Sequence, residues 1–250
     1  MPEDAAHDGR MTLVEHLTEL RTRLIISAVA VAVCSVVVFI FFPQILDVLE
    51  DPYRDVSREL DVCKPDGCEL SVIDPLAPFI VRVKVATYGG IALAMPIVMF
   101  QIWRFVTPGL HANEKRYAIP FLISAFVLFV LGAAVAWLTL PKALDFLLVD
   151  VSGGSLQPNI VADKYLNLVT FMLLAFGAAF EFPVLLVFLL LAHVITTRQL
   201  RRFRRHAVVG IVIVAALMTP SQDPYSLFFM AGPMYLFYEA SIVIGRVMKR

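Results

Sequence analysis

Carboxylates beside or inside long apolar runs are the side chains of this sequence best suited to chemistry. Glu15 and Glu19 lie one helical turn apart just before an apolar stretch, and Glu181 is the one charged residue within residues 165–195. A carboxylate at a bilayer surface can accept paired, charge-assisted hydrogen bonds from a guanidinium. A carboxylate inside a membrane is a functional candidate because it is costly to bury there. For Glu181 the alternatives are a protonated carboxyl group, a water-filled cavity or a structural hydrogen bond to a neighbouring helix.

The stretch around Glu15 and Glu19 is predicted to be helical. Thr12 and Glu15 form an S/T-x-x-E capping box, which places the start of the helix at Thr12. Glu19 can reach Arg23 one turn later. Because residues 24–42 contain no charge, the helix is predicted to run directly into a membrane span with its carboxylates at the bilayer surface. By position alone, a solvated interfacial helix is the simpler interpretation.

Composition indicates an integral membrane protein. Of the 250 residues, 59% are hydrophobic and only 17% are charged, and the mean hydropathy is +0.79. Soluble domains carry about 25% charged residues. The sequence predicts no cleavable signal peptide, because the first apolar run is too long for one. No nucleic-acid partner is predicted.

The apolar segments predict an all-α protein, one domain over residues 1–250 with six transmembrane helices. The predicted spans are 24–42, 85–103, 118–140, 166–192, 207–218 and 227–245. External loops are predicted at 43–84, 141–165 and 219–226, and cytoplasmic loops at 104–117 and 196–206. Lys and Arg number 14 on the side that holds both termini and 7 on the other. Both termini are therefore predicted to be cytoplasmic.

The fifth predicted span is short. Its 12 residues, 207–218, would cover about 18 Å as a helix, which is less than the hydrocarbon core of about 30 Å. We therefore predict local thinning of the bilayer around spans five and six. The alternative is that the span extends further, with Arg205 and His206 reaching the interface.

Cysteines and short motifs indicate neither an enzyme nor a metal site. Cys63 and Cys68 bracket a KPDG turn in the first external loop, where an oxidising compartment favours a disulfide. Without a nearby His, these two thiols do not complete a zinc site, and Cys34 is predicted to be a core residue. The sequence contains no G-x-S-x-G, Walker or H-E-x-x-H motif. We therefore predict no enzymatic activity, no cofactor and no metal.

Several segments, taken in order, resemble the TatC family, the receptor subunits of the twin-arginine protein translocase. They are HLTELRTRL (16–24), PLAPFIVRVKV (75–85), PIVMFQIWRFVTPGLHANEKR (96–116), FGAAFEFPV (176–184) and the MTP…GPMYLFYE pattern of residues 218–239. Each is modestly specific alone, but together, at matching spacing in a six-span chain, they are highly specific. The resemblance implies a glove-like bundle in the bacterial cytoplasmic membrane, with short helices five and six.

The resemblance also implies roles for individual residues. The cytoplasmic surface that recognises the twin-arginine signal peptide comprises two acidic residues, Glu19 and Glu114, together with Arg21, Gln101, Phe105 and Pro108. Glu181 matches an intramembrane carboxylate on the concave face of the bundle. External-loop positions that matter for transport are Pro52 and the Pro75–Phe79 region. Asp223, in the turn TPSQDP, departs from the tighter turn of many relatives, and the resemblance gives it no role.

These expectations favour a receptor and core subunit that binds twin-arginine signal peptides of folded cargo and nucleates a translocase driven by the proton gradient. The family partners TatA and TatB are expected to dock near spans five and six, and a homo-oligomer is expected within the receptor complex. A second class is a small secondary transporter with Glu181 as its proton-coupled site, although the two halves show no inverted repeat. A third is an intramembrane protease, for which no nucleophile motif is present.

Overall fold

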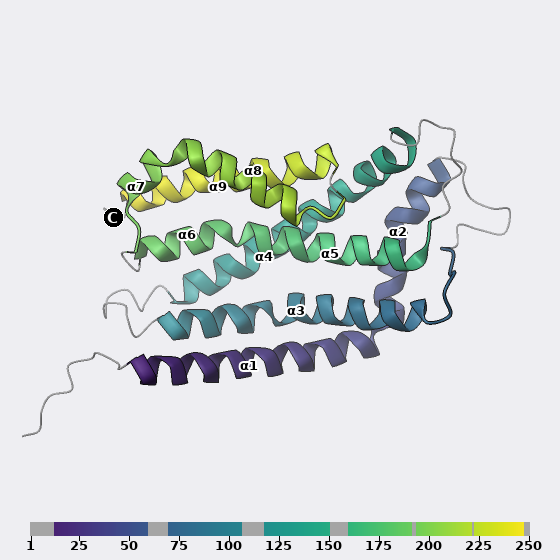
Figure 1. The fold of residues 1–250 in the computed structure, drawn as a ribbon, viewed down its shortest axis with the longest axis horizontal. Coiled ribbons are helices and arrows are strands. Elements are labelled where there is room, and N and C mark those ends of the chain that lie inside the picture. The colour runs from purple at the N-terminus through teal and green to yellow at the C-terminus, as the bar shows by residue number, and fades with distance from the viewer. Residues whose placement is uncertain are drawn as a thin grey trace, which may run out of the picture.

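The computed structural model describes residues 13–59, 70–106, 118–150, 160–191, 194–221 and 223–247. Within these residues the architecture is helical, as the sequence predicts (Figure 1). The helices are α1 (Leu13–Ile40), α2 (Phe42–Glu59), α3 (Ala77–Val106), α4 (Ala118–Asp145), α5 (Ala162–Phe180), α6 (Phe182–Leu191), α7 (Thr197–Arg202), α8 (Arg204–Met218) and α9 (Pro224–Val247). The π-helical segment η3 (Phe146–Asp150) continues α4.

Five segments of the described chain are long and apolar enough to cross a membrane. They are Val14–Ile40, Ala77–Phe105, Ile119–Leu148, Ala162–Leu191 and Pro224–Val247, and they correspond to predicted spans one, two, three, four and six. Helix α8 lies where span five is predicted but has only 15 residues. Its crossing of the membrane stays a prediction, as do the count of six spans, the side of the termini and the glove-like shape.

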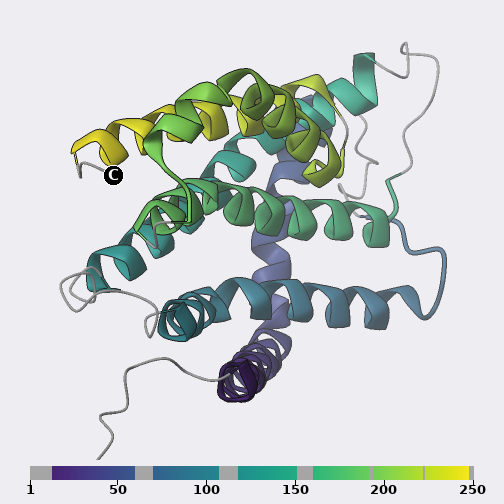
Figure 2. The same cartoon turned by 60° about the vertical axis from the view of Figure 1, so that its left-hand side comes forward.

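Helix α1 carries both the charged segment and the first apolar run without a break, as predicted; the proposed capping residue Thr12 lies outside the described residues. Helices α1 and α3 lie side by side in both views (Figures 1 and 2). Their backbones lie close together at Gly90, where an added Cβ would lie only 2.6 Å from the Ser35 Cα and N atoms. Small residues commonly allow such approaches between membrane helices.

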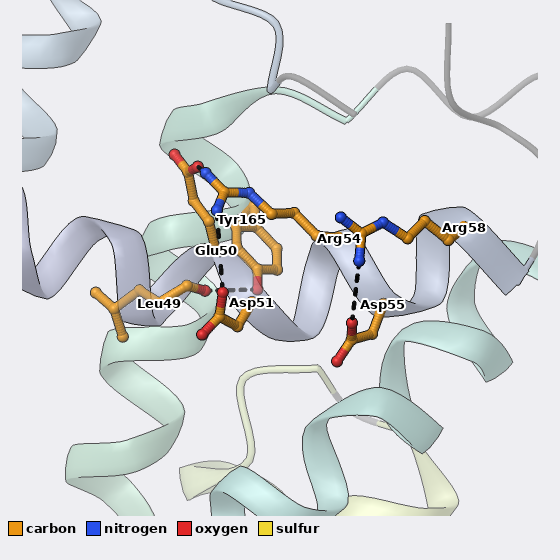
Figure 3. Close-up of polar contacts among 7 residues, drawn as sticks. All are labelled: Leu49, Glu50, Asp51, Arg54, Asp55, Arg58 and Tyr165. Carbon is orange, nitrogen blue, oxygen red and sulfur yellow. Dashed lines mark hydrogen bonds and ion pairs between the residues drawn. The ribbon is translucent and has the colours of Figure 1, made fainter. Parts of the chain in front are cut away.

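Helix α2 forms within the predicted external loop 43–84 and lies across one end of α3 and α5 (Figure 1). Its apolar face is buried, because Leu49 and neighbouring side chains join the main hydrophobic core. The Tyr165 hydroxyl of α5 donates a hydrogen bond to the Leu49 carbonyl at 2.8 Å (Figure 3). On the other face, Arg54 pairs with Glu50 at 2.7 Å (Figure 3). Helix α2 thus packs against α5 through both an apolar face and a hydrogen bond.

Arg82 of α3 caps the end of α1. Its guanidinium donates to the Phe39 carbonyl from Nη2 at 2.9 Å and from Nε at 3.3 Å, and its Cζ lies 4.2 Å from the Phe39 ring centroid. The last carbonyls of a helix lack donors within the helix, and Arg82, on the neighbouring helix α3, donates to one of them. This contact stabilises the corner between α1 and α2.

Candidate functional site

The carboxylate predicted to bind a basic ligand lies where the first turns of α1 meet the last turns of α3. Arg23 Nη2 donates to Glu19 Oε1 at 3.0 Å, which confirms the predicted i,i+4 pair. Arg23 Nη1 also donates to Gln101 Oε1 at 3.4 Å. The side chains of Arg23 and Glu19 are only 16% and 17% exposed. The ion pair is therefore partly withdrawn from water, which strengthens it relative to a surface pair.

An aromatic pair lies beside this polar group. The rings of His16 and Phe105 stack with their centroids 4.4 Å apart and their planes 22° apart. His16 precedes Glu19 by about one helical turn, and Phe105 follows Gln101 by one turn. The stack therefore continues the same α1–α3 interface toward the end of α3, and it places two aromatic rings about one helical turn from Glu19 and Gln101.

Two atoms of this site have unused hydrogen-bonding capacity. Glu19 Oε2 and Arg23 Nε are buried and have no hydrogen-bond partner among the described residues. A carboxylate can accept about four hydrogen bonds and a guanidinium can donate five. The site therefore offers an acceptor that suits a second N–H donor once a ligand arrives and the site opens.

The structure brings together three of the residues predicted for the cytoplasmic surface: Glu19, Gln101 and Phe105. Arg21 is exposed on α1, away from the buried Glu19–Arg23 contact. The other two, Pro108 and Glu114, lie outside the described residues. His16 also belongs to the site, and its place one turn before Glu19 is the one sequence signal that could have found it.

Glu181 lies at the break between α5 and α6. Its N–H donates to the Ala178 carbonyl at 3.1 Å and ends α5. Pro183 follows two residues later and has no N–H for the Ala179 carbonyl, which accounts for the interruption. The predicted fourth span is therefore two helices in one line, with the carboxylate at their junction.

Glu181 is 7% exposed, and neither of its carboxylate oxygens has a hydrogen-bond partner among the described residues. It lines a cavity of about 260 Å³ between several helices. The cavity wall includes Met99, Phe121, Leu185, Val214, Met218 and Met234. A carboxylate is thus held against an almost wholly apolar surface, a costly arrangement that natural proteins rarely keep without a function.

The remaining predicted positions lie on other helices, just before α3, or outside the described residues. Pro52 is buried inside α2, whereas Pro75 and Phe79 are exposed just before and within the first turn of α3. Cys63 and Cys68 lie outside the described residues. Cys34 is a half-buried free thiol in α1. Within the described ranges, no cluster of three His, Cys, Asp or Glu could hold a metal ion.

The turn between α8 and α9 gives Asp223 a structural role. Its Oδ1 accepts the Ser226 N–H at 2.7 Å, and its other oxygen accepts the Ser221 hydroxyl. Asp223 is therefore the N-cap of α9, with Pro224 at the first helical position. Where the same two helices meet at the opposite end, Arg204 pairs with Glu239 at 2.6 Å.

Comparison with known proteins places these features in a family. The family model described as Sec-independent protein translocase protein (TatC) matches residues 15–233. A solved chain described as the twin arginine translocase receptor TatC superposes with a TM-score of 0.77 at 36% identity, covering 94% of this chain and all of that one. The chain belongs to the TatC family.

Curated TatC proteins from several bacteria support the assignment. The TatC protein of Aquifex aeolicus is 36% identical over 242 residues, 96% of this chain and 97% of its own length. The TatC proteins of Frankia casuarinae and Corynebacterium kroppenstedtii are 40% and 35% identical over 95% and 97% of this chain. This chain spans 66% and 63% of the length of those two relatives.

Family membership confirms the resemblance drawn from the sequence segments. A TatC family member is a multi-pass protein of the bacterial inner membrane, and the apolar helices agree with that location. The family is named for protein translocation and not for catalysis, as the absence of catalytic motifs from the sequence predicts. The alternatives of a small secondary transporter and of a protease are not favoured.

Proposed function

We propose that this chain is the receptor and core subunit of a twin-arginine translocase, and that Glu19 binds an arginine of the signal peptide. The observation that supports the proposal most directly is the Glu19 carboxylate itself. It is partly buried, it already holds a guanidinium at 3.0 Å, and its second oxygen has no partner among the described residues. The solved relative with 36% identity is described as a twin arginine translocase receptor.

Arginine suits this site better than lysine. The planar guanidinium presents paired donors to both oxygens of a carboxylate, whereas an ammonium is a compact point charge. The His16–Phe105 stack beside Glu19 adds an aromatic surface on which a guanidinium can lie. The second arginine of the pair is assigned to Glu114, which the family resemblance places in the same recognition surface and which lies outside the described residues.

Apolar signal residues that follow the arginine pair then enter the bundle toward the Glu181 cavity. That cavity is lined by residues of α3, α4, α5, α6, α8 and α9, and its wall is almost wholly apolar, which suits an apolar segment. Exposed apolar side chains on α8 and α9, among them Leu217, Phe228 and Leu236, offer a surface in the membrane where TatA and TatB could pack. The same proposal includes further copies of this chain within the receptor complex, and a translocase that the chain nucleates and the proton gradient drives.

Signal-peptide binding by charge-neutralised variants tests the proposal. The full chain in nanodiscs is titrated with a fluorescent twin-arginine peptide, and anisotropy gives the Kd. We expect Glu19→Gln and Glu114→Gln each to weaken binding about tenfold or more, because each removes a charge-assisted pair from a partly desolvated site.

Glu239→Gln is the matched control. Glu239 is a carboxylate at the same end of the molecule, and its partner is Arg204 and not the Glu19 site. We expect the Kd of the Glu239→Gln variant for the twin-arginine peptide to stay within twofold of the Kd of the unmodified chain. Unchanged binding in both the Glu19 and the Glu114 variant would refute the assigned site.

A further inference from the structure

The guanidinium position at Glu19 is filled by the chain itself. Arg23 spans from Glu19 Oε1 at 3.0 Å to Gln101 Oε1 at 3.4 Å, so one side chain joins a carboxylate of α1 to an amide of α3. Gln101 is 7% exposed, which fixes the far end of this bridge in the helix interface. The group that holds Glu19 is therefore the same chemical group that the proposed function assigns to the ligand.

The second oxygen of the Glu19 carboxylate, Oε2, is not accessible to an incoming ligand. Glu19 Oε2 is buried and has no hydrogen-bond partner among the described residues. The Nε of Arg23 is buried in the same way. A second guanidinium cannot reach Oε2 while Arg23 and Gln101 keep this arrangement. A ligand arginine must therefore move Arg23 aside.

We propose that Arg23 is an internal placeholder for the signal arginine, so that signal binding exchanges one guanidinium for another. This inference rests on the proposed function, because it concerns the same Glu19 site. The exchange keeps Glu19 paired in both states, and an unpaired, partly buried carboxylate would be strongly unfavourable. Release of Arg23 from Gln101 also breaks a polar contact between α1 and α3, so the site can open toward the ligand.

The placeholder sets how tightly any ligand binds, but not which ligand is preferred. If the open form is a fraction of the population, the apparent Kd rises by the inverse of that fraction for every ligand alike. Removing Arg23 should therefore tighten the binding of twin-arginine and twin-lysine peptides by the same factor. A residue that merely shaped the site would change the ratio between the two peptides.

The experiment measures both peptides on the full chain in nanodiscs, with Arg23→Gln, Arg23→Lys and Arg202→Gln. Arg23→Gln should tighten binding about three- to tenfold for both peptides, the range that corresponds to a partly buried ion pair. Arg23→Lys should give a smaller gain, because an ammonium holds the carboxylate and the amide less firmly than a guanidinium does. Arg202→Gln is the control, because Arg202 is an exposed arginine of α7 at the same end of the molecule as the start of α1 (Figure 1). The variant loses one positive charge but leaves the Glu19 site unchanged. Its Kd for each peptide should stay within twofold of that of the unmodified chain.

Weaker or unchanged binding by Arg23→Gln would overturn the placeholder, and so would a changed ratio between the two peptides. If Arg23→Gln does not fold, Arg23→Lys decides: tighter binding supports the placeholder and weaker binding overturns it. Failure of the proposed function looks different. In that case the unmodified chain shows no preference for the twin-arginine peptide, or Glu19→Gln binds as tightly as the unmodified chain.

Discussion

Glu181 carries a carboxylate group in surroundings that are almost wholly apolar. Both of its oxygens lie against apolar side chains without a donor among the described residues. An apolar side chain of similar length would fill the same place without a desolvation cost. The sequence therefore retains a carboxylate that stability alone would remove, which is typical of residues kept for function.

Replacing Glu181 by Met should make the protein more stable and less active. We expect Glu181→Met to raise the free energy of unfolding by about 1–3 kcal/mol, because a buried polar group without partners is removed. The export of a twin-arginine reporter in cells that depend on this chain should fall. Thermal unfolding of the detergent-purified chain, measured beside the export assay, checks both effects. A variant that is less stable than the unmodified chain would show that the carboxylate has a partner in the folded protein.

The sequence identifies the two carboxylates but not what surrounds them. Glu19 and Glu181 stand out because a charge next to or within an apolar run is conspicuous, and the Glu19–Arg23 pair follows from helical spacing alone. The bond from Arg23 to Gln101, 78 positions away, depends on the register with which α1 packs against α3. No local pattern records that register, so the closed state of the site becomes visible only in three dimensions.

At the scale of elements, periodicity and apolar length predict the long helices well and the interruptions poorly. Helix α2 is missed because its residues are polar on average and Pro52 lies inside it, where proline usually ends a helix. The break between α5 and α6 is missed because the run is apolar on both sides of Glu181. In contrast, the short α8 is expected, since the basic residues before it and the polar turn after it limit its length.

The packing of α1 on α3 should depend on Gly90. A Cβ at this position would lie 2.6 Å from the Ser35 backbone, so Gly90→Ala must push the two helices apart. We expect a loss of about 1–3 kcal/mol in the free energy of unfolding. Gly210→Ala in α8 is the matched control, because an added Cβ there meets nothing within 4 Å. The control should be neutral or up to about 1 kcal/mol more stable, since alanine favours helix. Equal midpoints of thermal unfolding for the two variants would contradict the close approach.

On the scale of the whole molecule, the helices differ in how much membrane they can cover. The five long segments have 24 to 30 residues, enough for a core of about 30 Å even when tilted. Helix α8 has 15 residues and would cover about 22 Å. In Figure 1 the hairpin of α8 and α9 ends short of the end where α2 crosses α3 and α5. The turn at its tip carries polar side chains, including Ser221 and Asp223.

The bilayer should therefore be thinner beside this hairpin than elsewhere around the protein. The depth in the bilayer is measured at two exposed positions. Position 217, where Leu217 is 81% exposed near the end of α8, is the test position, and position 131, where Leu131 is exposed midway along α4, is the reference. Each is changed to Cys in a chain whose three native cysteines are replaced by Ala, and a spin label reports its depth by accessibility to oxygen and to a nickel chelate. Because the polar residues of the adjacent turn are costly to place in hydrocarbon, the label at position 217 should lie at headgroup level, and the label at 131 near the bilayer centre. A label at 217 as deep as that at 131 would mean that the hairpin tip is embedded in lipid and that the membrane keeps its full thickness.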